Sequence, residues 1–165
     1  MIIFNTTPLI LFLKELNYVD IFNYCLDIDA ELIIPFEVYE EFIGEGKEKL
    51  NSLISNNVLI VKEVKKDPLE LIMKKHPQLG AGESSVLAFG EEHKLDKNLL
   101  IIDERRASNI ANSMNLNSIG SMGLLFLLNK KKILSKKDLC DIAKQINTSS
   151  FYFDFKKQGL EWLLK

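Results

Sequence analysis

Acidic side chains follow several short apolar runs of this sequence, at the points where such runs would end as strands. Asp103 and Glu104 come directly after the strongest of these runs, Glu41 lies on the segment after another, and Glu83 follows a glycine-rich break. Asn5 has the same kind of position after the first run, but it is an amide. The carboxyl ends of parallel strands meet at one edge of a sheet, so we expect these side chains to share that edge.

Carboxylate and amide oxygens are the ligands that hard cations such as Mg²⁺ or Mn²⁺ prefer. An ion held there can activate a water and stabilise the charge that builds on a phosphodiester. No competing soft ligand is expected, because His76 and His93 lie in no metal-binding motif. Cys25 and Cys140 have no metal-ligand spacing around them and are expected to be buried thiols in a reducing cytoplasm.

A structural explanation also exists for each of these acids. Glu83 opens a predicted helix and Asp103 precedes one, and a negative charge is stabilised at a helix N-terminus without any catalytic role. Among Glu37, Glu40 and Glu41, two are expected to be surface charges. Glu41 lies three residues after a buried apolar position and can share its inward side, and Glu37 shares the face of Glu41 and is the reserve candidate.

The elements that must position these residues alternate along the whole chain. Strands are expected at 2–4, 32–34, 58–61, 99–102 and 118–119. One helix is expected to begin at Pro8, capped by Thr7, another to begin at Pro35, and a further one to end near residue 54. Other helices are expected at about 19–25, 68–75, 83–92, 120–128 and 135–146, and the helix after Asp103 and Glu104 is marked by the apolar stripe Ala107, Ile110, Ala111 and Met114. Alternating strands and helices predict an α/β fold with a parallel sheet and helices on both faces, and continuously apolar strands support this.

The bulk composition predicts one ordinary domain. A chain of 165 residues suits a single domain, 1–165, and we expect a core at about 1–135 and a helical tail at 136–165. No apolar run reaches the roughly 18 residues that a membrane span needs. No basic segment precedes an apolar one at the N-terminus, so we expect no secretory signal and a cytoplasmic location.

Charge is distributed unevenly along the chain. Residues 1–83 carry 8 Lys or Arg against 14 Asp or Glu, whereas residues 84–165 carry 13 against 9. An acidic, metal-holding cleft beside a basic rim would fit a phosphodiester substrate. The alternative is that the basic residues, mostly lysines at 130–137, form a solvated surface.

Taken together, these segments resemble the PIN-domain family, and most closely its VapC-like branch with the "GxGE" element (the DUF3368 type). The resemblance covers about residues 1–135. It rests on Asn5-Thr6-Thr7-Pro8-Leu9-Ile10, Ile34-Pro35-Phe36-Glu37-Val38-Tyr39-Glu40-Glu41, Leu79-Gly80-Ala81-Gly82-Glu83, Ile101-Ile102-Asp103-Glu104 with Ala111, and Ile119-Gly120-Ser121-Met122-Gly123-Leu124-Leu125.

The resemblance implies a three-layer α/β/α sandwich, flavodoxin-like, and a ribonuclease that depends on Mg²⁺ or Mn²⁺. Such proteins often dimerise and are often the toxin of a toxin–antitoxin pair, so the implied partners are RNA, an antitoxin and a second copy. Carried over residue by residue, the family's acidic quartet falls on Asn5, Glu41, Glu83 and Asp103, with Glu104 an additional or substitute ligand. Thr6 or Thr7 could supply a hydroxyl beside the first position.

This sequence departs from the family pattern at two positions. Asn5 stands where the family usually has Asp; an amide offers one carbonyl oxygen to a cation but removes a negative charge. Ser108 stands where this branch often has Arg, which removes a phosphate contact or an ion pair. Three carboxylates would hold one ion acceptably and a second one poorly.

Two hypotheses follow. The first is a metal-dependent endoribonuclease in which Glu41, Glu83 and Asp103 bind the ion and Asn5 is a neutral group beside it. The second, motivated by Asn5, is a regulatory module that binds RNA or protein without turnover. A receiver-like phosphoacceptor domain is disfavoured, since that fold needs an acidic pair after its first strand. The aromatic tail, 151–164, is expected to pack on the domain, with a partner surface as the alternative.

Overall fold

A parallel sheet of five strands lies at the centre of the residues that the computed structural model describes, 1–28 and 30–165. The order across the sheet is β3-β2-β1-β4-β5, and every neighbouring pair is parallel. The fold expected from the sequence, an α/β/α sandwich around a parallel sheet, is confirmed. The strands are β1 (Ile2–Phe4), β2 (Leu32–Pro35), β3 (Ile60–Lys62), β4 (Leu99–Ile101) and β5 (Ser118–Ile119).

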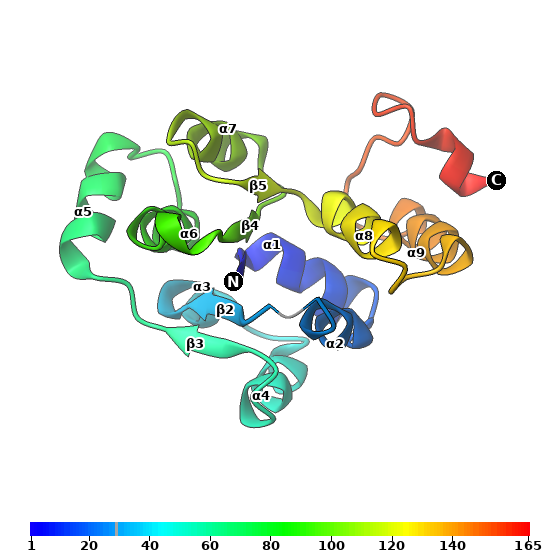
Figure 1. Ribbon diagram of the computed structural model, residues 1–165, viewed down its shortest axis with the longest axis horizontal. Coiled ribbons are helices and arrows are strands. Elements are labelled where there is room, and N and C mark those ends of the chain that lie inside the picture. Colours follow the sequence, from blue (N-terminus) through cyan, green and yellow to red (C-terminus); the bar gives the residue numbers. More distant parts are fainter. Residues whose placement is uncertain (29) are drawn as a thin grey trace.

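Helices cover both faces of this sheet. In Figure 1, α5 and α6 lie to one side of the strands, and α1, α2, α8 and α9 lie to the other. The α-helices are α1 (Thr6–Leu9), α2 (Asp20–Leu26), α3 (Phe36–Glu41), α4 (Lys47–Ser55), α5 (Lys66–Lys75), α6 (Ala81–Glu92), α7 (Arg105–Ser113), α8 (Ser121–Lys130) and α9 (Lys136–Thr148). Three further helical segments are η1 (Ile10–Glu15), η2 (Lys94–Asp96) and η3 (Glu161–Leu164).

β1 is the central strand, although it is the first in the chain. Ile2 pairs with Leu32 of β2 on one side and with Leu99 of β4 on the other. At the end of β1, the backbone N–H of Asn5 donates to the carbonyl oxygen of Ile101 over 3.1 Å. β1 and β4 therefore end side by side, and the residues that follow the two strands lie at the same edge of the sheet.

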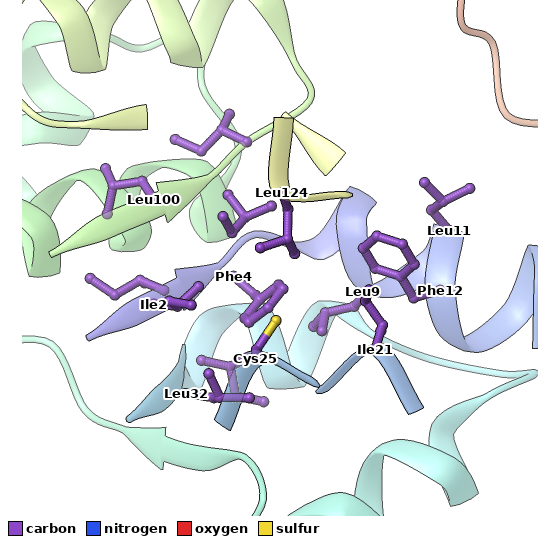
Figure 2. Close-up of a cluster of buried hydrophobic side chains, with 14 of the residues drawn as sticks. Ile2, Phe4, Leu9, Leu11, Phe12, Ile21, Cys25, Leu32, Leu100 and Leu124 are labelled. Carbon is purple, nitrogen blue, oxygen red and sulfur yellow. The ribbon is translucent and has the colours of Figure 1, made fainter. Parts of the chain in front are cut away.

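The core between the sheet and the α1, α2 and α8 layer is apolar and buried (Figure 2). Phe22 packs between Phe4, with ring centroids 5.3 Å apart, and Phe12, with centroids 6.3 Å apart. Cys25 is fully buried here, and burial raises the pKa of its thiol to about 12. That thiol is therefore inert at neutral pH, as expected, whereas Cys140 is only half-buried.

Three local expectations differ from the structure. The helix expected from Pro8 becomes a π-helix over η1, where the backbone N–H of Leu16 donates to the carbonyl oxygen of Leu11, five residues earlier. The third strand is shifted to Ile60–Lys62 from the expected 58–61. Thr7 does not cap α1: Asn5 holds the N-cap position, without a side-chain cap bond, and the Thr7 hydroxyl bonds to a carboxylate elsewhere. No helix within the described residues is long and apolar enough to cross a membrane.

Candidate functional site at the carboxyl edge of the sheet

Asn5 directly follows the central strand and is almost completely buried, with 1% of its surface exposed. Its side-chain Nδ2 donates to Glu104 Oε2 over 2.9 Å. Its Oδ1 is buried and has no hydrogen-bond partner among the described residues. The amide therefore turns its donor toward the carboxylate and leaves a carbonyl oxygen free to accept a cation or a water.

Glu104 links the ends of β1 and β4. One carboxylate oxygen accepts from Asn5 and the other accepts from the Thr7 hydroxyl. Both donors are neutral, so the turn after β1 satisfies this acid without an opposite charge. An aspartate at position 5 would instead set two carboxylates against each other.

Asp103 is held on both oxygens by one residue at the start of α8. The Ser121 backbone N–H donates to Asp103 Oδ1 over 2.7 Å, and the Ser121 hydroxyl donates to Oδ2 over 2.6 Å. Burial raises the pKa of the Asp103 carboxyl, the bonds from Ser121 lower it, and the charge of Glu104 raises it further; the net direction is upward. Gly120 completes the cradle, because a Cβ there would stand 2.9 Å from Asp103 Oδ1.

Glu41, the last residue of α3, reaches the start of α6. Its Oε1 accepts from the Gly82 backbone N–H over 2.6 Å, and its Oε2 accepts from the Thr6 hydroxyl over 2.7 Å. Position 82 must be glycine for this contact, since a Cβ there would lie 2.2 Å from Glu41 Oε2. Unlike Asp103, the Glu41 side chain is exposed to solvent.

Glu83 behaves as a helix-capping residue, which is the structural explanation offered for it above. Its Oε2 accepts from the Gly80 backbone N–H over 2.8 Å, at the first turn of α6. A Cβ on Gly80 would stand 3.7 Å from Oε2 of Glu83 and equally far from Oε1 of Glu41. The carboxylates of Glu41 and Glu83 therefore border the same glycine.

The remaining candidates differ in burial. Glu37, the reserve candidate, is half-buried, and its Oε2 has no partner in the part of the chain that the structure describes. Glu40 is exposed, as expected for a surface charge. Ser108 stands where the branch that the sequence resembles often has Arg, and its hydroxyl lies 3.3 Å from the hydroxyl of Ser118.

The predicted site residues thus form two groups joined by the turn at 5–7. Asn5, Asp103 and Glu104 lie where β1 and β4 end, while Glu41 and Glu83 lie beside the glycines that open α6. Within residues 1–28 and 30–165, no three Asp, Glu, His or Cys side chains are arranged as a metal-binding cluster.

The chemistry of the donor set nevertheless fits a hard cation. Every candidate ligand is an oxygen, and a carboxylate that accepts two hydrogen bonds keeps further lone pairs. The free Oδ1 of buried Asn5 adds a neutral oxygen ligand. Sequence reasoning missed the donors Ser121 and Gly82. The signal for both was their place in the first turn of a helix whose N-cap is a glycine, Gly120 for Ser121 and Gly80 for Gly82.

The site also opens into a cavity of about 660 Å³ that is lined by Asp103, by the start of α8 and by the segment after α9.

A comparison with protein-family models matches residues 1–157 to the family described as DUF3368, a PIN domain. Comparisons with curated proteins and with solved structures give no match.

Proposed function

Because the family match covers residues 1–157, the chain belongs to the PIN-domain family, and we propose that it is an endoribonuclease that depends on Mg²⁺ or Mn²⁺. The observation that carries this proposal is the meeting of Asn5, Asp103 and Glu104 at the ends of two adjacent parallel strands, with a buried amide oxygen left unpaired. A parallel sheet binds ligands at this edge.

The residues that would hold the ion are Asp103, Asn5 and Glu104 on one side and Glu41 and Glu83 on the other. When bound, the ion supplies Lewis-acid stabilisation of a phosphodiester's developing charge and lowers the pKa of a water. No protein nucleophile is needed for hydrolysis of this kind.

The chain's own contribution is positioning. Ser121 fixes the Asp103 carboxylate on both oxygens, so this acid cannot rotate away from the edge. Thr7 and Asn5 do the same for Glu104. Glu41 stands at the solvent side, held by a backbone N–H and a hydroxyl, and can meet a substrate phosphate only when a cation lies between them.

The test is cleavage of a mixed pool of single-stranded RNA with Mn²⁺, for the parent chain and for Asp103→Asn, Glu83→Gln and Glu41→Gln. Loss of a ligand should lower the rate by at least the roughly 10–100-fold that loss of a residue supporting a ligand costs. Glu40→Gln, an exposed acid on the same helix as Glu41, is the matched control and should cleave like the parent. Unchanged cleavage in both Asp103→Asn and Glu83→Gln would rule out this mechanism.

A second candidate function is favoured by one contact. The bond from Asn5 to Glu104 gives this carboxylate a neutral donor without any ion, as suits a module that binds RNA or protein and does not turn over. Calorimetric titration with Mn²⁺ separates the two: tight binding favours the nuclease, and absence of binding favours the module. Asn5→Asp that gains cleavage while the parent has none would also favour the module.

The biological setting is a further part of the proposal. A toxin role predicts that induced expression arrests growth of a host cell, that Asp103→Asn abolishes the arrest, and that a cognate antitoxin relieves it. Homodimer formation is checked by light scattering of the purified chain. The cytoplasmic location and the division into a core and a tail stay predictions.

A further inference from the structure

The cavity beside Asp103, here the tail groove, has walls from three parts of the chain. Asp103 and Arg105 line it beside the sheet edge, Met122 and Phe126 line it from α8, and residues between 151 and 160 line it from the segment after α9. In Figure 1 the chain after α9 runs back past the start of α8 before η3 ends it. The groove is therefore continuous with the proposed reactive edge.

The outer wall is anchored to the domain at several points. Phe155 is buried and packs edge-on against Phe153, with ring centroids 4.7 Å apart. Leu163 is fully buried, and the Ser150 hydroxyl donates to Glu15 Oε2 over 2.7 Å. A wall held on both sides of residue 152 presents its side chains in fixed positions.

Tyr152 is the unusual side chain of this wall. It lines the groove and is 85% exposed, whereas the phenylalanines on either side of it are half-buried. In the described part of the chain no aromatic ring pairs with it. An exposed, unpaired ring on a fixed backbone is a surface on which a nucleobase can stack.

The charges of the lining fit a nucleic-acid backbone. Arg105 and Lys157 line the groove, and neither forms an ion pair within residues 1–28 and 30–165. Asp103 is the one carboxylate among the lining residues. Two free cations and an exposed aromatic ring in one channel are the elements of a single-strand binding surface.

We propose that the tail groove holds the nucleotides that flank the scissile phosphodiester of single-stranded RNA. A base stacks on Tyr152, and Arg105 and Lys157 contact phosphates. The inference deepens the proposed function and rests on it for the position of the scissile bond. Single strands are favoured because the bases of a duplex are already stacked on one another.

The test is binding of a fluorescein-labelled, mixed-sequence single-stranded RNA to the full chain in EDTA, so that no cleavage intervenes, followed by anisotropy. Tyr152→Ala should weaken binding about tenfold, whereas Tyr152→Phe, which keeps the ring, should bind like the parent. Lys157→Ala should reduce the slope of log K against log salt by about 0.7, the value for one phosphate contact on a single strand.

Lys156→Ala is the matched control, because Lys156 is an exposed neighbour that does not line the groove. The proposal is overturned if Tyr152→Ala and Lys157→Ala both bind single-stranded RNA like the parent. It is also overturned if the parent does not bind single-stranded RNA, and a protein segment would then be the occupant of the tail groove. RNA binding through Tyr152 without cleavage under any divalent ion would contradict the nuclease and leave the groove standing. If Tyr152→Ala cleaves RNA as fast as the parent does, the groove proposal is contradicted and the nuclease proposal stands.

Discussion

The two halves of the proposed site hold their carboxylates in opposite ways. Asp103 is half-buried and bonded on both oxygens to one serine at the start of α8, whereas Glu41 is exposed and bonded to a glycine N–H and a threonine hydroxyl. Burial raises the pKa of the Asp103 carboxyl, and no ion pair to this carboxyl is found within residues 1–28 and 30–165. The Asp103 carboxylate is thus held rigidly, and burial makes its charged form less favourable. The Glu41 carboxylate can change its position when a ligand binds.

Removal of one hydroxyl from each half gives the largest expected contrast in stability. Ser121→Ala deletes a buried donor to a charged acceptor and should lower the free energy of unfolding by about 1.5–3 kcal/mol. Thr6→Ala deletes a donor to an exposed carboxylate and should cost under about 1 kcal/mol. Urea denaturation measures both, and equal losses would contradict the contrast.

Addition of one methyl group to each half should reveal which carboxylate can yield. In Gly120→Ala the new Cβ meets the fixed carboxylate of Asp103, and we expect a loss of about 1–3 kcal/mol. In Gly82→Ala the Glu41 side chain can swing into solvent, and the roughly 1 kcal/mol by which Ala exceeds Gly in a helix offsets the strain. The second variant should therefore stay folded in thermal melts while its cleavage falls, and a large drop in its melting temperature would contradict this.

Neutralising each acid should separate stability from activity. Asp103→Asn removes a half-buried charge that has no ion pair within the described residues, so the metal-free chain should gain stability, by about 0.5–2 kcal/mol, as it loses cleavage. Glu41→Gln should change stability by no more than about 0.5 kcal/mol. Denaturation in EDTA at pH 7 measures both, and a less stable Asp103→Asn chain would show that the buried charge is compensated.

The smallest effect is expected in the dependence of stability on pH. Folding raises the pKa of the Asp103 carboxyl above its ordinary value of 3.8, so the folded chain holds this proton more tightly than the unfolded chain does. The contribution of this carboxyl is therefore present below pH 3.8 and is lost as the pH rises through the folded pKa. The free energy of unfolding is measured against pH for the parent and for Asp103→Asn, and the difference between the two curves isolates the contribution of this carboxyl. If the parent became more stable relative to Asp103→Asn as the pH rises, the expected direction would be wrong.

Much of the fold was predictable because it rests on local patterns. Apolar runs such as 2–4 and 99–101 alternate with helical periodicity, and that alternation is enough for a parallel sheet with its site at one edge. The π-helix at η1 was not predictable, because its register depends on packing against the core and not on the spacing of apolar residues. The family assignment is confirmed, whereas the ligand roles of Asn5, Glu41, Glu83, Asp103 and Glu104 stay predictions.

The bonds within the site were harder to predict than its position. Ser121 binds Asp103 from 18 positions away and Gly82 binds Glu41 from 41 positions away. Such pairings depend on how α6 and α8 are set against the sheet, and no short window of sequence contains that information. Glu83 shows the converse, since its bond to Gly80 lies within one helical turn and the capping explanation was available from sequence.

The central place of β1 has a consequence for how the protein is made. β1 leaves the ribosome before both of its neighbours in the finished sheet, β2 and β4, and β4 ends near residue 101. At about 5–20 residues per second, the nascent chain waits roughly 5–20 s for that second neighbour. During this interval an apolar strand lacks one of its partners, so conditions that slow translation should lengthen its exposure to chaperones and to aggregation.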